Sequence, residues 1–129
     1  IGVAKFHLEG GSCDTRPGTG AGSPATMPRQ QAMNFKHAGP AVDVWASAAS
    51  LYKLLTGEYP RHFPQDVDPW QIVMNEKPRP LQELLPDAPA HLAKVIDLAL
   101  VDEPAICCQK AAEFKSALHQ AIELDDIWI

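Results

Sequence analysis

This sequence of 129 residues has few cysteines and no excess of positive charge. Its three cysteines are Cys13, which is isolated, and the adjacent Cys107 and Cys108, so they do not make the framework of bridges found in small secreted domains. The formal net charge is −5, with acidic and basic residues mixed along the chain, and no basic surface is expected to attract phosphodiester backbones. These absences favour a reducing, cytoplasmic compartment and argue against nucleic acid as a partner.

A long hydrophobic run is also missing. The longest, at residues 44–55, is interrupted by Ser47, Ser50 and Lys53 and is shorter than the roughly 20 apolar residues that a membrane span requires. We therefore expect no membrane-spanning segment. The sequence begins with Ile1, and residues 1–5 lack the basic start, apolar stretch and cleavage site of a signal peptide. The chain is expected to be cut from a longer protein and not targeted.

No arrangement of metal ligands stands out. The five histidines show no pairing at i,i+4 spacing, so we expect no zinc site; they are His7, His37, His62, His91 and His119. Cys107 and Cys108 are expected to be a buried pair of small apolar side chains rather than reactive thiols.

Apolar spacing predicts a mainly α-helical fold in a single domain. No segment shows a convincing period of two, as a half-buried strand would. Residues 1–28 are expected to be a long loop, because residues 9–28 hold five of the eight glycines and have no helical period. The helices are expected at residues 29–33 and 41–56, from Asp68-Pro69 to Lys77, from Pro89 to Asp102 and at residues 110–124, with an irregular link at residues 81–86.

The helix at residues 41–56 is the most distinctive of these. It follows Gly39-Pro40, a break and a proline favoured in the first turn, and it precedes Gly57, the expected left-handed C-cap. Its polar residues form one narrow stripe, Asp43, Ser47, Ser50 and Lys53, and the remaining faces are apolar. A helix of this pattern is expected to be the buried centre of a bundle.

Several short motifs occur in an order that is similar to one known family. They are Gly22-Ser23-Pro24, Pro28-Arg29-Gln30, Asp43-Val44-Trp45, the stretch at residues 54–60 and the stretch at residues 103–114. In this order they resemble the C-terminal lobe of a eukaryotic-type Ser/Thr protein kinase, from the activation segment to the last helix. Ile1-Gly2 resembles the end of that family's Asp-Phe-Gly motif. The resemblance covers nearly the whole chain, with residues 1–28 as an activation-segment-like loop and residues 29–129 as a helical C-lobe.

The resemblance implies a substrate-docking loop that contains Gly22, Ser23, Pro24 and Met27. Ser23 would steady the catalytic base and the incoming hydroxyl, and residues 24–27 would shape the pocket beyond the phosphorylated residue. Without the family, Ser23 before Pro24 is better explained as a turn or cap residue, because Ser and Pro dominate turns. Ser12, Thr15 and Thr19 lie where such loops are often phosphorylated, with Arg16 or Lys5 as phosphate partners, although Ser and Thr are abundant in any solvated loop.

The resemblance also implies that Asp43 and Trp45 support a catalytic loop that is not encoded in these residues. Asp43 would bond to backbone amides of that loop. Asp43 has a simpler alternative role, as a carboxylate in the first turn that the helix dipole favours. For Trp45, and likewise for Tyr52, the alternative is packing in the core.

One pair of residues departs from the family. A partly buried Glu and Arg normally tie the activation segment to the lobe, and the aligned residues here are Gln30 and Cys107. Losing one member of such a pair costs about 3 to 5 kcal/mol, whereas losing both can be nearly neutral. The double replacement predicts a looser tether.

The parent activity that the resemblance implies is ATP-dependent phosphorylation of protein Ser and Thr, with ATP and Mg²⁺ as cofactors. Phosphoryl transfer needs a Gly-rich loop, a Lys, metal-binding Asp and Asn residues and a base Asp, and the sequence contains none of these motifs. We expect no catalytic residues and no activity from the chain alone, and its partners would be a protein substrate or an N-terminal kinase lobe. The alternatives are a pseudokinase-like protein-interaction module, suggested by Gln30 and Cys107, or a degenerate gene fragment.

Overall fold

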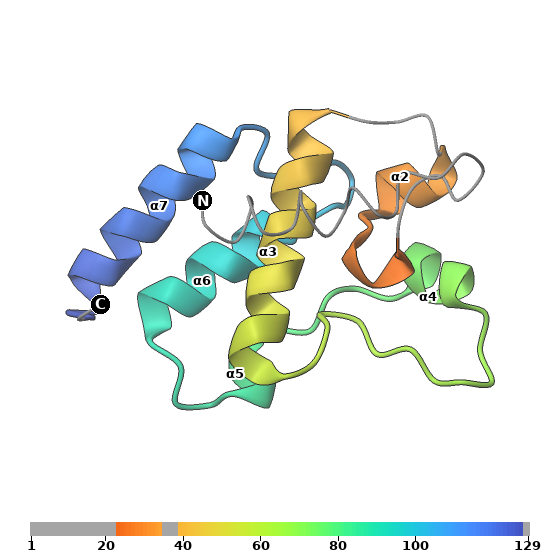
Figure 1. Cartoon of the computed structure of the whole chain (residues 1–129), viewed down its shortest axis with the longest axis horizontal. Coiled ribbons are helices and arrows are strands. Elements are labelled where there is room, and N and C mark those ends of the chain that lie inside the picture. The colour runs from red at the N-terminus through yellow and green to blue at the C-terminus, as the bar shows by residue number, and fades with distance from the viewer. Residues whose placement is uncertain (1–22, 35–38, 128–129) are drawn as a thin grey trace, which may run out of the picture.

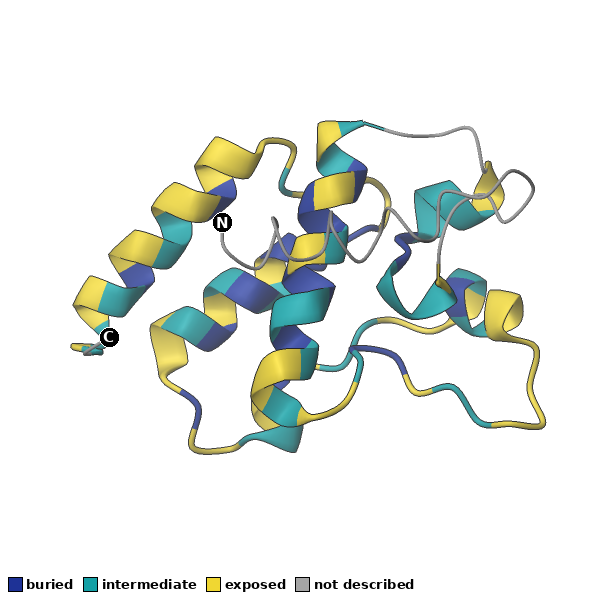
Figure 2. Cartoon of the chain, in the orientation of Figure 1, coloured by how far each residue is buried: buried dark blue, intermediate teal, exposed yellow. Residues whose placement is uncertain are grey.

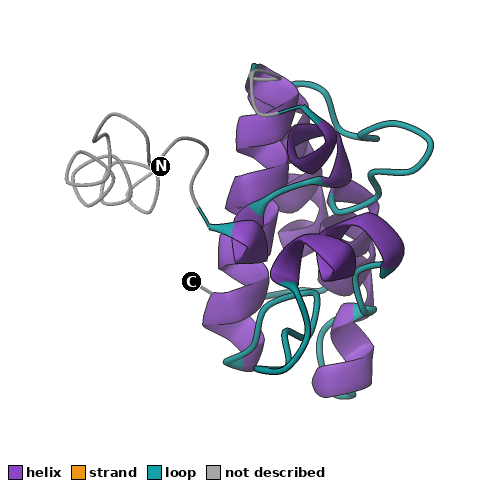
Figure 3. Ribbon diagram, turned by 90° about the vertical axis from the view of Figure 1, so that its right-hand side faces the viewer, coloured by secondary structure: helices purple, strands orange, loops and turns teal. Residues whose placement is uncertain are grey.

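The computed structural model describes residues 23–34 and 39–127, and these residues form helices and loops with no strand (Figure 1, Figure 3). The elements are η2 (Pro24–Thr26), α2 (Arg29–Met33), α3 (Pro40–Thr56), α4 (Pro69–Asn75), α5 (Leu81–Leu84), α6 (Ala90–Ala99) and α7 (Ala111–Leu124). The prediction of a mainly helical fold is confirmed for this part of the chain. Ile1-Gly2, Lys5, Ser12, Cys13, Thr15, Arg16, Thr19 and Gly22 lie outside the described residues, as do His7 and His37.

Helix α3 is the centre of the structure. In Figure 1 it runs through the middle, with α6 and α7 on one side and α2 and α4 on the other. It contacts η2, α5, α6 and α7, and its Trp45, Ala48, Ala49 and Tyr52 are completely buried. Because these four residues recur at three- and four-residue spacing, they lie along one stripe and form the spine of the core. The expected central position of this helix is confirmed.

The ends of α3 follow the local signals. Pro40 occupies the first turn after Gly39, so the helix begins one residue earlier than expected. At the other end Gly57 has a φ of 81°, in the left-handed region that a glycine adopts without a steric penalty, and its N–H donates to the carbonyl of Lys53 at 2.8 Å. The Nζ of Lys53 donates in turn to the Gly57 carbonyl at 2.8 Å.

The last turn of α3 differs from the expectation of a helix that is buried on nearly every side. Leu54 is 65% exposed and Leu55 is 38% exposed, although both are apolar. Figure 2 shows exposed residues at this end of the helix as well as in its first turn, and the buried residues lie between Val42 and Tyr52. Burial therefore falls off beyond Tyr52, toward Gly57.

Residues 81–86 were expected to be an irregular link, and that prediction is wrong. Residues Leu81–Leu84 form the short helix α5, with Leu81 completely buried. Its first N–H, that of Leu81, donates to Oδ1 of Asp97 on α6 at 2.8 Å, and the N–H of Leu85 closes the turn on the Leu81 carbonyl. A side chain from another helix thus caps α5, which is why the segment itself carries no start signal.

Helices α6 and α7 are joined in a similar way. The N-cap position of α6 is Pro89, which provides no side-chain cap. Asp125, just beyond α7, accepts hydrogen bonds from the N–H groups of His91 at 3.2 Å and Leu92 at 2.8 Å, and its Oδ1 lies 2.7 Å from Nδ1 of His91. Asp125 therefore caps the first turn of α6 from the far end of α7.

This cap predicts an acid-sensitive step in stability. Burial raises the pKa of Asp125, but the hydrogen bonds from His91 and Leu92 outweigh it and hold that pKa below its ordinary value. The folded state therefore favours the carboxylate, so its stabilising effect is present above the ordinary pKa of about 3.9 and is lost as the pH falls through the lower pKa of the folded state. We expect Asp125→Asn to be less stable than the wild type in urea unfolding near neutral pH, and the difference to shrink in acid. Asp126→Asn is the matched control, and an equal difference at both pH values would contradict the prediction.

Candidate functional site

The segment of residues 23–27 has a local structure that its sequence explains. Ser23 has extended backbone, and its Oγ accepts the N–H of Ala25 at 3.1 Å, which caps η2. Pro24 occupies the first position of this 3-10 turn, and the N–H of Met27 donates to the Pro24 carbonyl at 3.3 Å. The cap alternative for Ser23 is thus confirmed, and its side chain lies at an exposed position.

The same segment is anchored at its other end. Met27 is 1% exposed and Pro28 is also fully buried, and η2 contacts both α3 and α4. The carbonyl of Met27 accepts a hydrogen bond from Nη1 of Arg61 at 3.3 Å. Residues 23–26 therefore form a short turn that is anchored by the buried Met27 and is exposed to solvent at Ser23.

Arg61 belongs to a buried ion pair that sequence analysis did not identify. Its Nη2 lies 2.8 Å from Oδ2 of Asp102, and the two side chains are 2% and 5% exposed. The guanidinium also donates from Nε to the Glu76 carbonyl at 2.7 Å and lies over the ring of Trp45, 5.1 Å from its centroid. The N–H of the Trp45 ring donates to the Leu100 carbonyl at 2.9 Å, close in sequence to Asp102.

Asp102 also contacts the start of α2. Its Oδ2 accepts the backbone N–H of Arg29 at 2.7 Å, and its own carbonyl accepts the side-chain N–H of Gln30. The Arg29 side chain adds a weaker contact, with Nε 3.5 Å from a carboxylate oxygen of Glu103 in a half-exposed pair. Arg29 and Gln30 are therefore held by residues at the end of α6.

The structure also shows the surroundings of Gln30 and Cys107. Gln30 donates to the main-chain carbonyl of Asp102, and two ion pairs lie in this region, the buried Arg61–Asp102 and the more exposed Arg29–Glu103. Cys107 is exposed, so the expected buried cysteine pair is wrong for that residue. Cys108 is partly buried; burial raises the pKa of its thiol, so it is a poor nucleophile, as expected.

Asp43 and Trp45, the two expected supports of a catalytic loop, have different surroundings. Trp45 is completely buried, which confirms the core-packing alternative. Asp43 is exposed in the first turn of α3, and its carboxylate makes no hydrogen bond or ion pair with the other described residues. Within the described residues neither side chain is hydrogen-bonded to Ser23, although η2 contacts α3.

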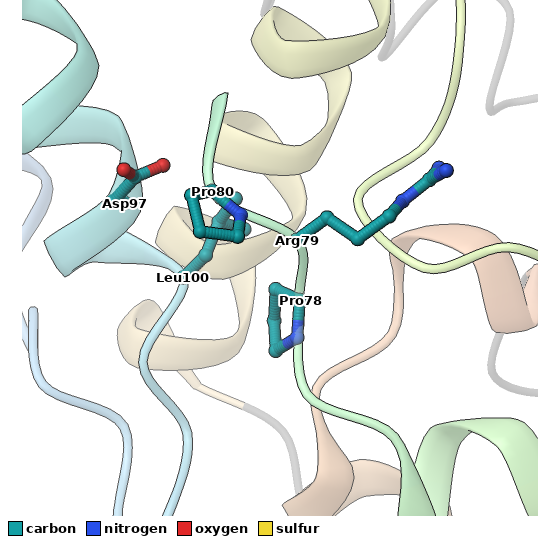
Figure 4. Close-up of a pocket in the computed structure, with 5 residues that line it drawn as sticks. All are labelled: Pro78, Arg79, Pro80, Asp97 and Leu100. Carbon is teal, nitrogen blue, oxygen red and sulfur yellow. The ribbon is translucent and has the colours of Figure 1, made fainter. Parts of the chain in front are cut away.

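The cavities in the described part of the chain are small or open. One of about 80 Å³ is lined by Pro78, Arg79, Pro80, Asp97 and Leu100 (Figure 4). This volume is well below the roughly 300 to 1,000 Å³ of ordinary ligand pockets. Figure 4 shows the Arg79 side chain directed away from Asp97, so the two charges do not converge. Burial raises the pKa of Asp97, whose carboxylate already accepts the N–H of Leu81.

A more open hollow of about 230 Å³ lies beside the C-terminal end of α3. Its lining includes Lys53, Arg61 and Arg79 together with aromatic side chains. These cations are already used within the protein: Lys53 binds the Gly57 carbonyl and lies over the Tyr59 ring, and Arg79 donates to the carbonyls of Tyr59 and Pro60. The cations that line the hollow therefore already make hydrogen bonds within the protein.

In residues 23–34 and 39–127 no three His, Cys, Asp or Glu side chains gather as a metal site would require. No helix in this part of the chain has both the length and the apolar character needed to cross a bilayer. No family model matches the chain, and no curated protein or solved structure is similar to it.

Proposed function

We propose that this chain is the C-terminal lobe of a Ser/Thr protein kinase and that residues 23–27 form the surface on which a protein substrate docks. The observation that carries the proposal is the arrangement of this turn. Met27 is buried at its base beside the central helix α3, while Ser23 remains exposed at its open end. A turn that is capped at Ser23 and anchored at Met27 suits recognition of an extended peptide, because an ordered surface loses little conformational entropy on binding.

The order of the helical elements gives further support. The family resemblance implies a substrate loop followed by a buried central helix and then by shorter helices, and η2, α3 and α4 to α7 occur in that order. In the proposed parent protein, ATP and Mg²⁺ supply the phosphoryl group and neutralise its charge, and an N-terminal lobe holds the nucleotide. The proposed parent protein works in the cytoplasm. No catalysis is expected from this chain by itself, because the motifs that bind nucleotide and metal are absent from its sequence.

The pseudokinase-like interaction module was suggested by a weakened tether at Gln30 and Cys107. The described residues give that suggestion no additional support, because Arg29 and Gln30 both contact Asp102. Peptide docking is therefore the better-supported proposal.

Blocking the turn should abolish peptide docking. Ala25, partly exposed within η2, is replaced by tryptophan, whose ring would cover the turn. The immobilised chain is offered a degenerate peptide pool with a central Ser or Thr, and retained peptides are counted by mass spectrometry. We expect Ala25→Trp to reduce retention about tenfold or more, equivalent to at least 1.4 kcal/mol of lost binding.

Ala112→Trp is the matched control, because it adds the same side chain at an exposed position on α7, on the opposite side of α3 from η2 (Figure 1). It should retain peptides as the wild type does. Equal retention by both variants, or no retention by the folded wild type, would exclude residues 23–27 as a peptide-docking surface.

A further inference from the structure

Two charged residues, Arg61 and Asp102, are buried in the described part of the chain, at 3% and 4% exposure. Burying an ion pair removes both charges from water, and replacing such a pair by apolar residues of similar volume is often neutral or stabilising. Stability alone is therefore a weak explanation for this pair. The groups that it contacts are more informative.

Each nitrogen of the Arg61 guanidinium has a separate acceptor. Nε donates to the Glu76 carbonyl after α4, Nη1 donates to the Met27 carbonyl, and Nη2 donates to Asp102. A lysine side chain ends in a single nitrogen, so it cannot donate from three separate atoms in the fixed, forked geometry of a guanidinium. The guanidinium thus joins three segments that are distant in the sequence.

The Asp102 carboxylate completes the arrangement. Its Oδ2 accepts from Arg61 and also from the backbone N–H of Arg29, at 2.8 and 2.7 Å. The pair therefore fixes the peptide groups on both sides of Pro28, the Met27 carbonyl by the cation and the Arg29 N–H by the anion. Both are charge-assisted hydrogen bonds in a buried place, which are stronger and more directional than neutral ones.

We propose that Arg61 and Asp102 are positioning residues for the segment of residues 23–27, and that they replace the tether for which Gln30 and Cys107 lack the charges. The functional meaning of this inference rests on the proposed docking role of that segment. Trp45 sets the position of Arg61, since its ring lies beneath the guanidinium and its N–H is fixed to the Leu100 carbonyl. The tether therefore links the segment directly to the centre of α3.

Amide hydrogen exchange of the whole chain tests this proposal, with Arg61→Met/Asp102→Leu as the main variant. The apolar pair keeps the core filled but offers no partner to Met27 or Arg29. We expect amides of residues 27–32 to exchange about tenfold faster or more, and amides of α6 and α7 to change by less than about threefold. Glu58→Gln is the control, because its half-exposed ion pair with Arg79 does not contact the segment.

A uniform increase across all helices, or no increase at residues 27–32, would overturn the proposal. If the double variant does not fold, Arg61→Lys is measured in the same way, because it keeps the charge and loses the fork. If neither folds, the wild type decides: Arg29 N–H must then exchange as slowly as amides in the middle of α3, and faster exchange overturns the proposal.

Peptide retention by the same variants separates this inference from the proposed function. Faster local exchange with loss of retained Ser/Thr peptides supports both. Faster local exchange in a chain whose wild type retains no peptide supports the positioning role and removes the docking role. Unchanged local exchange rejects the positioning role whatever the peptide result.

Discussion

Replacing Trp45 with alanine is expected to lower the free energy of unfolding by about 3 to 5 kcal/mol. The side chain is completely buried in the middle of α3, so its removal leaves a cavity between this helix and its neighbours. The Leu100 carbonyl loses its donor and the Arg61 guanidinium loses the ring beneath it. Since small domains are stable by only about 5 to 15 kcal/mol, this change removes a large fraction of the total.

Urea unfolding followed by far-ultraviolet circular dichroism measures this effect without depending on tryptophan fluorescence. Leu54→Ala is the control on the same helix, because Leu54 is 65% exposed and its loss should cost about 0.5 kcal/mol or less. Trp45→Phe separates two contributions, since it keeps the aromatic ring and leaves the Leu100 carbonyl unpaired, at about 1 to 3 kcal/mol. A loss for Trp45→Ala as small as that of Leu54→Ala would show that α3 is not the central helix.

Most of the helices could be predicted because their signals are local. Gly39-Pro40 and Gly57 mark α3, and both signals lie within a few residues of the boundaries that they define. Asp68 begins α4 in the same way, with its Oδ1 accepting the N–H of Trp70 at 3.0 Å. Helix α5 could not be predicted in this manner, because its cap is Asp97, a residue of another helix.

The ion pair beneath residues 23–27 was missed for a related reason. Arg61 follows the exit of α3 and Asp102 follows α6, and in the sequence each has only a local meaning, a turn residue and a helix stop. Their partnership depends on the packing of α3 against α6, which brings these distant positions together. Arg61 stands between Pro60 and His62-Phe63, and this local context does not indicate a buried partner. The motif alignment instead drew attention to Cys107, whose side chain is exposed.

The Arg61–Asp102 pair predicts strong non-additivity in stability. Arg61→Met leaves the Asp102 carboxylate buried without its cation, and Asp102→Leu leaves the guanidinium buried without its anion. Each single change is expected to cost about 3 to 5 kcal/mol, whereas the double variant should cost much less than the sum. The double variant stays below the wild type in stability, because the carbonyls of Met27 and Glu76 and the N–H of Arg29 lose these partners. The four proteins form a double-mutant cycle, measured by urea unfolding at neutral pH.

The half-exposed pair Arg79–Glu58, at 3.5 Å, provides the matched cycle. Its members are partly hydrated, so the coupling between Arg79→Met and Glu58→Leu should be about 1 kcal/mol or less. A coupling at Arg61–Asp102 no larger than this would mean that water reaches the pair and that its charges do not constrain one another. A large coupling would show that the two charges compensate one another for their burial. Faster exchange confined to residues 27–32 in the double variant would show a second effect: in the wild type, the hydrogen bonds that join this pair to the Met27 carbonyl and the Arg29 N–H position the main chain on both sides of Pro28.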